Sequence, residues 1–278
     1  MIMDISFEKN SFGSRLGSML RVDLRRMLRS RKLYIIVGAC LVMPILILVM
    51  VTMLEGSVSV DPQTGAESVM KGFDSVWQII GSVSGGSMMS AGAESGAAMS
   101  MDITSMCNIN MLYFFVAVLV CSFVSEDFRS GYAKNLFTVR AKKTDYVASK
   151  TIVCIIGGAM MILAFFVGTF IGGAISGLSF EMVGFSAFEL VMCILSKMLL
   201  VSVFVPIYIV MGVIGKQRLW MSVLLSFMVG MFMFMMIPML TPLNSSIMNV
   251  GLCIAGGAMF GFGLGAVSNV ILKKTSLV

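Results

Sequence analysis

Several uninterrupted apolar runs of about 20 residues constrain this chain more than any other feature of its sequence. A helix of that length matches the hydrocarbon thickness of a bilayer. Only 12% of the residues are charged and 58% are hydrophobic, whereas roughly a quarter of the residues of soluble domains are charged. The runs also lack the short alternating segments of a transmembrane β-barrel. We therefore predict an all-α polytopic membrane bundle and exclude a water-soluble fold.

Six transmembrane helices are predicted within a single transmembrane domain of residues 1–278. They cover residues 33–54, 107–124, 151–178, 187–214, 219–240 and 248–272. An external loop at 55–105 follows the first span, and a polar insert of 26 residues at 125–150 separates the second from the third. The polar start of the chain and the length of the first apolar run argue against a cleaved signal peptide, so the first span is expected to act as an uncleaved anchor.

Small residues in two spans predict close helix contacts. The segments GTFIGGA, from Gly168, and GGAMFGFGLGA, from Gly256, would let neighbouring helices approach closely. Pro44 lies inside the first span, where the loss of a backbone hydrogen bond predicts a kink.

The basic residues set the expected orientation. Of the 20 lysines and arginines, 18 flank the spans on the side that holds both termini and the 125–150 insert. The positive-inside rule places that side in the cytoplasm, and a bacterial plasma membrane is the expected location. The net charge of +6 is thus a topology signal, and we expect no nucleic-acid partner.

The segment 15–32 reads as an interfacial amphipathic helix. One face carries Leu16, Met19, Leu20, Leu24, Met27 and Leu28, and the other carries Arg21, Arg25, Arg26 and Arg29. Such a helix would lie among the lipid headgroups with its arginines on anionic lipids. The alternative is a basic anchor that only fixes topology.

A second helical pattern lies in the external loop. Phe73, Val76, Trp77 and Ile80 recur at helical spacing. This spacing favours equally a short helix on the bilayer surface and a loop helix packed on its own bundle.

The insert 125–150 is longer than a helix connection needs. Glu126 and Asp127 would favour the N-terminus of a short amphipathic helix, and cations close the segment. Its functional interpretation is a docking element for a soluble partner, and its alternative is a solvated loop whose charges fix topology.

Together these residues resemble the type-2 ABC exporter permeases. The likeness rests on the arginine-rich helix, the first span, the external loop and the pattern ED-R-GY-KNL that begins at Glu126. The resemblance implies that residues 15–32 form the connecting helix of that family and that the insert holds its coupling helix, which seats in a groove of the ATPase. The positions carried over as ATPase-coupling residues are Glu126, Arg129, Gly131, Tyr132 and Asn135.

The resemblance also implies the partners. No GxxxxGK[ST] phosphate loop occurs in the sequence, so ATP and Mg are expected on a separate ABC ATPase and no enzyme activity is expected of this chain. Two ATPase copies and a second permease subunit, identical or paralogous, would complete the exporter.

The cargo implied by the KN-F-VR-KKTDY pattern is an amphipathic or antimicrobial peptide, because the pattern resembles phenol-soluble-modulin exporters and lantibiotic immunity systems. Export of lipid, drug or polysaccharide is the alternative. A stand-alone channel or secondary transporter would carry paired intramembrane charges and repeat symmetry, and neither is evident. An intramembrane enzyme would need clustered acids, histidines or cysteines, and the chain has no histidine.

Methionines are concentrated in the fifth span, and their flexible thioether side chains suggest a translocation path for apolar cargo. Ordinary packing is the alternative. The candidate path residues are Met228, Met231, Met235 and Lys197. Lys197 lies near the midplane if its span starts at Ala187, or at the outer surface if the span starts at Met198. We favour the surface position, because a midplane lysine is costly. No metal site is predicted, since no cysteine or histidine neighbours reinforce the thioethers.

Overall fold

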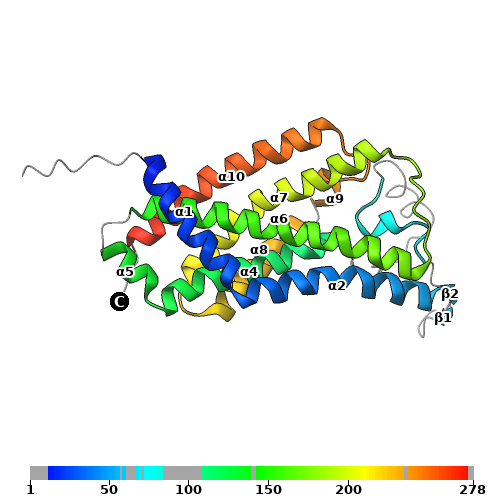
Figure 1. The fold of residues 1–278 in the computed structure, drawn as a ribbon, viewed down its shortest axis with the longest axis horizontal. Helices are drawn as coiled ribbons and strands as arrows, with labels where there is room; N and C mark the ends of the chain where they lie inside the picture. The colour runs from blue at the N-terminus through cyan, green and yellow to red at the C-terminus, as the bar shows by residue number, and fades with distance from the viewer. Residues whose placement is uncertain are drawn as a thin grey trace, which may run out of the picture.

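A computed structural model describes residues 12–56, 58–60, 67–69, 72–83, 108–138, 142–234 and 237–274. Helices lie side by side in an elongated bundle (Figure 1). Within these described ranges, five helices are long and apolar enough to cross a membrane, so this is a multi-pass membrane protein. They are α2 (Arg31–Leu54), α4 (Leu112–Arg129) with the preceding 3₁₀ turn η2 (Ile109–Met111), α6 (Lys143–Ser176), α7 (Ala187–Gly215) and α10 (Ile247–Lys274).

The remaining elements are shorter. They are α1 (Phe12–Arg29), η1 (Val76–Ile79), α5 (Tyr132–Thr138), α8 (Leu219–Phe234), α9 (Ile237–Leu240) and the strands β1 (Val58–Val60) and β2 (Glu67–Val69). The two strands pair antiparallel, with Val58 opposite Val69, and they add to the predicted all-α fold a small element that the sequence pattern did not indicate. The predicted span 219–240 corresponds to α8, of 16 residues, and α9, of 4 residues.

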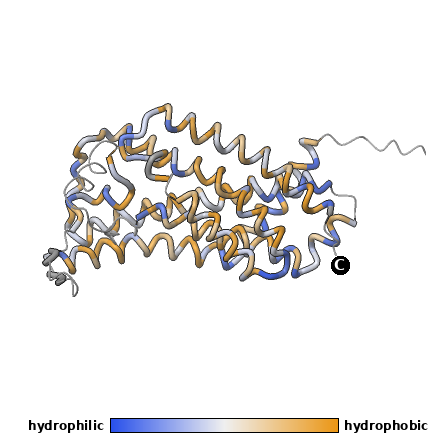
Figure 2. The backbone as a smooth tube through the Cα atoms, turned by 180° about the vertical axis from the view of Figure 1, so that it is seen from behind, coloured by the Kyte–Doolittle hydropathy of each residue, from blue (hydrophilic) through white to orange (hydrophobic). Residues whose placement is uncertain are grey.

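The two ends of the bundle differ in chemistry. α1, α5 and the last turns of α10 gather at one end, and the β1–β2 pair lies at the other (Figure 1). Hydrophobic residues run along the length of the helices, and hydrophilic residues concentrate towards the ends (Figure 2). We refer below to the end with α1 and α5 as the α5 end.

Local signals explain where the long helices begin and end. Ser186 and Glu189 form a capping box at the start of α7, where each accepts a hydrogen bond from the backbone N–H of the other. Gly177 ends α6 in the left-handed conformation, with φ of 68°. Gly131, with φ of 71°, follows the last turn of α4 and allows the chain to reverse into α5.

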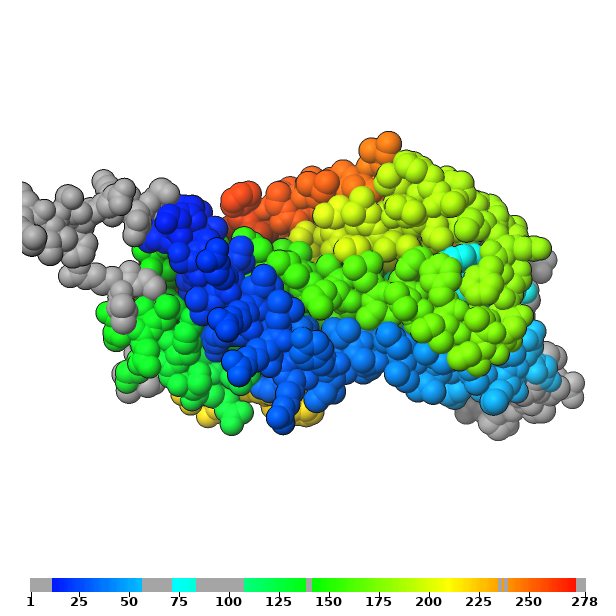
Figure 3. All heavy atoms as spheres, viewed as in Figure 1, coloured from blue at the N-terminus to red at the C-terminus, as the bar shows by residue number. Residues whose placement is uncertain are grey.

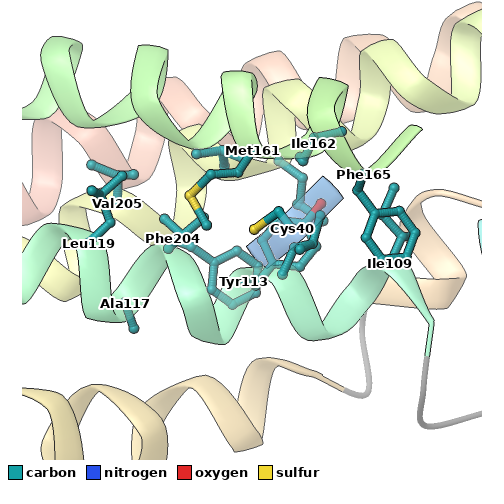
Figure 4. Close-up of a cluster of buried hydrophobic side chains, with 14 of the residues drawn as sticks. Cys40, Ile109, Tyr113, Ala117, Leu119, Met161, Ile162, Phe165, Phe204 and Val205 are labelled. Carbon is teal, nitrogen blue, oxygen red and sulfur yellow. The ribbon is translucent and has the colours of Figure 1, made fainter. Parts of the chain in front are cut away.

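α4 and α7 form the interior of the bundle. In the most apolar stretch of each, 72% of the residues are buried, compared with 6% in α10. Aromatic rings fill the space between them, and Tyr113 packs on Phe204 with 4.7 Å between ring centroids (Figure 4). The outer helices α2 and α10 therefore present most of their apolar surface outwards, as lipid-facing helices do.

Glycines bring α2 and α6 into close contact. A Cβ at Gly168 would collide with the carbonyl of Leu41 and with Pro44, and a Cβ at Gly172 would come within 2.9 Å of the Ile45 backbone. This confirms the small-residue prediction for the third span, because only glycine permits such an approach. In α10 the prediction holds only in part, since no atom lies within 4 Å of a Cβ placed at Gly261.

The pattern at residues 73–80 forms a buried turn. η1 is a 3₁₀ helix, and the side chain of Trp77 is only 3% exposed. Its ring lies within 6.5 Å of four phenylalanine rings, and its Nε1–H donates to the carbonyl of Phe180 at 3.0 Å. The surface-helix interpretation is therefore wrong and the packed alternative is right, because the apolar side chains cover the end of α6 instead of lipid.

Candidate functional site

Four charged side chains meet at the α5 end of the bundle, and we call them the ion-pair cluster: Asp23 and Arg26 of α1, Asp127 of α4 and Lys150 of α6. The Lys150 ammonium lies 2.9 Å from an Asp23 oxygen and 2.7 Å from an Asp127 oxygen. The Arg26 guanidinium lies 2.9 Å from Asp127 and 3.7 Å from Asp23. The cluster thus joins three helices.

Three of the four charged side chains in this cluster are fully buried, which is rare for charged residues. The side chains of Asp23, Asp127 and Lys150 are 0% exposed. Two neutral donors of α6 complete the cluster, since the Ser149 hydroxyl donates to Asp23 at 2.7 Å and the Tyr146 hydroxyl donates to Asp127 at 3.0 Å. Two carboxylates balance two cations, which is the condition under which buried charges are tolerated.

The short helix α5 contacts the cluster through two aromatic rings, Tyr132 and Phe137, and the Phe137 ring packs on Tyr146 with 5.4 Å between ring centroids. The Arg26 guanidinium lies 4.0 Å from the centroid of the Tyr132 ring, at cation–π distance. Burial and the carboxylate of Asp23 raise the pKa of Tyr132, so its phenol is neutral at physiological pH. Burial opposes the charge of Arg26, but the carboxylates of Asp127 and Asp23 outweigh that effect and raise its pKa. The Tyr132 ring is therefore stacked on a permanently charged guanidinium.

Further contacts hold α1 against α6. Arg15 forms a 3.0 Å ion pair with the buried Asp145. Met27 is 1% exposed and packs where Gly157 lacks a side chain. Figure 3 shows α1 lying obliquely across the surface of the bundle at the α5 end. α1 is thus fixed along its length by charge at both ends and by apolar packing.

These contacts correct the predicted arginine face of segment 15–32. Arg21, Arg25 and Arg29 are exposed, as the amphipathic pattern indicates, but Arg26 turns inward to Asp127. The reason is Asp23, a buried acid on the predicted apolar face. Asp23 lies four residues before Met27 and therefore on the same apolar face of the helix. An acid on that face was the sequence signal that a cation from elsewhere in the chain is buried against it. The roles of Asp23, Asp127 and Lys150 were missed, because the sequence does not show which helices meet.

The predicted coupling residues occupy two different elements. Glu126 and Arg129 lie in the last turn of α4, so the expectation that Glu126 and Asp127 start a helix is wrong. α4 continues past them because the first residue that breaks the helix is Gly131. Tyr132 begins α5, and Asn135 is exposed on it. Glu126 pairs with Lys32 at 2.7 Å.

Lys197 is buried inside the bundle. α7 runs unbroken from Ala187, and Lys197 is 1% exposed, so the favoured position at the outer surface is wrong. Its ammonium donates to Asn110 at 3.1 Å and to Thr241 at 2.9 Å. These neutral oxygens provide the polar surroundings that the sequence pattern did not reveal.

The path methionines do not join Lys197. Met228 is 59% exposed and Met231 is 64% exposed on the outer face of α8, whereas Lys197 faces the interior. Met235 lies outside the described residues. Among the described residues, no three His, Cys, Asp or Glu side chains form a group that could hold a metal ion.

A family model described as "ABC-2 family transporter protein" matches residues 20–233, which is more than half of the chain. The matched region begins within α1 and ends within α8, so it contains the ion-pair cluster and α5. No curated protein and no solved structure gives a match.

Proposed function

The chain belongs to the ABC-2 transporter family, and on that premise we propose that it is the permease subunit of an ATP-driven exporter of amphipathic peptides. As a permease of an ABC transporter, it works with an ATPase partner subunit. In our proposal two permeases, identical or paralogous, assemble with two ATPase copies that bind ATP and Mg. In the same proposal α8 and α9 together cross the membrane once. This crossing lies between α7 and α10 and brings the number of spans to six.

The ion-pair cluster carries the mechanistic part of the proposal. The ATPase would seat against α5, because the exposed Lys134 and Asn135 on this helix are free to contact it. A push on α5 reaches Arg26 through the Tyr132 ring, and from there it reaches α4 and α6 through the shared carboxylates. Because the cluster is buried and its charges are balanced, these helix ends move together more readily than they separate.

The orientation follows from the cations at the α5 end. Lys142, Lys143, Lys216, Arg218 and Lys273 lie in the last or first turns of helices, or in the turns between them, at this end. The positive-inside rule supports a cytoplasmic location for this end and for both termini. ATP is on that side of a bacterial plasma membrane, which agrees with ATPase docking at α5.

A matched pair of charge reversals tests the docking. Lys134→Glu changes an exposed cation of α5, and Arg218→Glu changes an exposed cation of the α7–α8 turn. We expect the first to lose most of the ATPase that co-purifies with the permease and the second to retain it. Equal retention in both variants would show that the ATPase does not seat on α5.

A third variant separates docking from transmission. Arg26→Gln removes the cation beneath the Tyr132 ring without changing the exposed face of α5. This variant should keep its ATPase and lose cargo-stimulated ATP hydrolysis. Full stimulation in Arg26→Gln would contradict the proposed route through the cluster.

The proposed path runs along the exposed face of α8, between paired permeases. Met228, Met231 and the 83% exposed Phe232 give this face a soft, apolar surface that can adapt to varied peptides. Lys197 lies off this path in the present conformation, since it is buried. ATPase stimulation of the reconstituted complex by an amphipathic peptide, and not by the same peptide scrambled, would support the cargo class. Stimulation only by lipids, drugs or polysaccharides would exclude it.

A further inference from the structure

A polar cavity of about 350 Å³ opens at the α5 end between α2, α4 and α8. Its polar lining comes from Lys32 of α2, from Ser122, Ser125, Glu126 and Arg129 of α4 and from the adjacent Ser130. Leu219, the first residue of α8, closes the remaining side. The ion-pair cluster uses none of these residues, so the cavity is a separate feature of this end.

The charges around the cavity leave one cation uncompensated. Lys32 and Glu126 pair at 2.7 Å, each about half exposed. In the part of the chain that the structure describes, Arg129 forms no ion pair and no hydrogen bond through its side chain. The cavity therefore carries one excess positive charge, which attracts a ligand with a single negative charge.

A buried hydroxyl in the wall also lacks a partner. Ser125 is 1% exposed, and its Oγ makes no hydrogen bond, although it lines the cavity. A buried hydroxyl without a partner is costly, and such groups normally find one. By contrast, Ser122 already donates to the carbonyl of Leu119 at 2.9 Å. An acceptor oxygen entering the cavity would satisfy Ser125.

Two exposed aromatic residues typical of the membrane interface are close in the chain to residues that line the cavity. Trp220, next to Leu219, is 80% exposed, and Tyr34, two residues after Lys32, is 61% exposed. Tryptophan and tyrosine concentrate where headgroups meet acyl chains. Beyond Trp220 the outer face of α8 is apolar, with Leu224 50% exposed, so an acyl chain would find an apolar surface below the cavity.

We propose that this cavity binds the phosphodiester headgroup of an anionic phospholipid such as phosphatidylglycerol. Arg129 and Lys32 contact the phosphate, and the Ser125 hydroxyl donates to one of its oxygens. The acyl chains lie beside Trp220 and Leu224 in the first turns of α8, short of the Met228 to Phe232 surface assigned to the cargo path. Basic pockets between helices on the cytoplasmic side of membrane proteins bind headgroups in this way. An acidic side chain of the ATPase would carry the same charge, but the exposed Trp220 next to Leu219 favours a lipid.

The two tryptophans of the chain allow a direct measurement on the purified permease without its ATPase. In a Trp77→Phe background, the fluorescence of Trp220 reports which lipid lies beside the cavity. The probe is brominated phosphatidylglycerol in phosphatidylcholine vesicles, compared with brominated phosphatidylcholine at the same content. We expect stronger quenching by brominated phosphatidylglycerol than by brominated phosphatidylcholine. The relative binding constant of the two lipids, obtained from the two quenching curves, is the preference of the site for phosphatidylglycerol.

Three variants and one control decide whether the cavity causes that preference. Arg129→Gln should lower it about fivefold, which is the contribution expected of one cation near a membrane surface. Ser125→Ala should also lower it, and Glu126→Gln should raise it, because Lys32 is released from its carboxylate. Arg25→Gln makes the same charge change on the exposed side of α1 and should leave it unchanged.

Two results would overturn the assignment. The first is a preference that Arg129→Gln leaves intact, or that Arg25→Gln lowers equally, since either would mean that general surface charge attracts the lipid. The second is displacement of the lipid by millimolar inorganic phosphate, which would make this a site for free phosphate. Arg129→Lys, which keeps the charge, should retain most of the preference and shows that the site folds. Because no ATPase is present, these outcomes do not depend on the proposed exporter function.

Discussion

Replacing Lys150 by methionine removes the fully buried cation of the ion-pair cluster while preserving most of the length and volume of the side chain. Lys150 contacts Asp23 at 2.9 Å and Asp127 at 2.7 Å, and all three side chains are 0% exposed. Its ammonium also lies 3.8 Å from the centroid of the Phe123 ring. The substitution leaves two carboxylates with Arg26 alone, so the buried cluster becomes negative.

The expected loss follows from that imbalance. Removing one partner of a buried ion pair costs about 3–5 kcal/mol, because a charge is left without compensation in a poorly solvated site. The assay is the free energy of unfolding in mixed detergent micelles, followed by circular dichroism. Lys32→Met is the matched control: its pair with Glu126 is about half exposed on both sides, so a loss of less than about 1 kcal/mol is expected.

A double substitution tests the electrostatic explanation itself. Asp127→Asn combined with Lys150→Met restores charge balance between Asp23 and Arg26. The double variant should therefore unfold with a smaller loss than the sum of the two single losses, with a coupling energy of about 0.5–3 kcal/mol. Additive losses, or a Lys150→Met loss no larger than that of Lys32→Met, would refute the reasoning.

Three further outcomes are expected in the same unfolding assay. Gly168→Ala should lower the free energy of unfolding by about 1–3 kcal/mol, because the added methyl collides with the backbone of α2. In Gly265→Ala the added methyl meets no atom within 4 Å, so this variant should be nearly neutral or stabilising. Trp77→Ala should lose about 3–5 kcal/mol and the 80% exposed Trp220→Ala much less, so equal losses would contradict the burial of η1. Lys197→Met should lose about 1–3 kcal/mol, because it leaves two buried oxygen acceptors without their donor, and an unchanged stability would show that they find other partners.

Most of the helical architecture could be predicted from the sequence. The ends of α2, α7 and α10 lie within a few residues of the predicted spans, because apolar runs in a bilayer must satisfy their backbone hydrogen bonds internally. The gathering of cations at one end of the bundle also follows from the positions of the lysines and arginines between the spans. The close approach of α6 to α2 was readable from the glycines of GTFIGGA.

The fates of individual charges were not readable in the same way. Arg26 and Arg25 are neighbours in an arginine-rich helix, yet Arg26 turns to Asp127 and Arg25 is exposed. Lys150 appears in the sequence as one cation among several in a polar insert, but it is 0% exposed at the start of α6. Periodicity assigns a residue to a face of its own helix and does not identify the helix that covers that face.

The sequence by itself determined that this chain enters a membrane as a set of helices and which end of each helix carries the positive charge. Both are properties of local segments, fixed by the cost of placing charges and unpaired backbone in hydrocarbon. The tertiary structure alone decided that Asp23, Asp127 and Lys150 meet, and that Lys197 finds Asn110 and Thr241. These pairings join residues far apart in the chain, and a charge is stable inside the bundle only where packing brings it a partner.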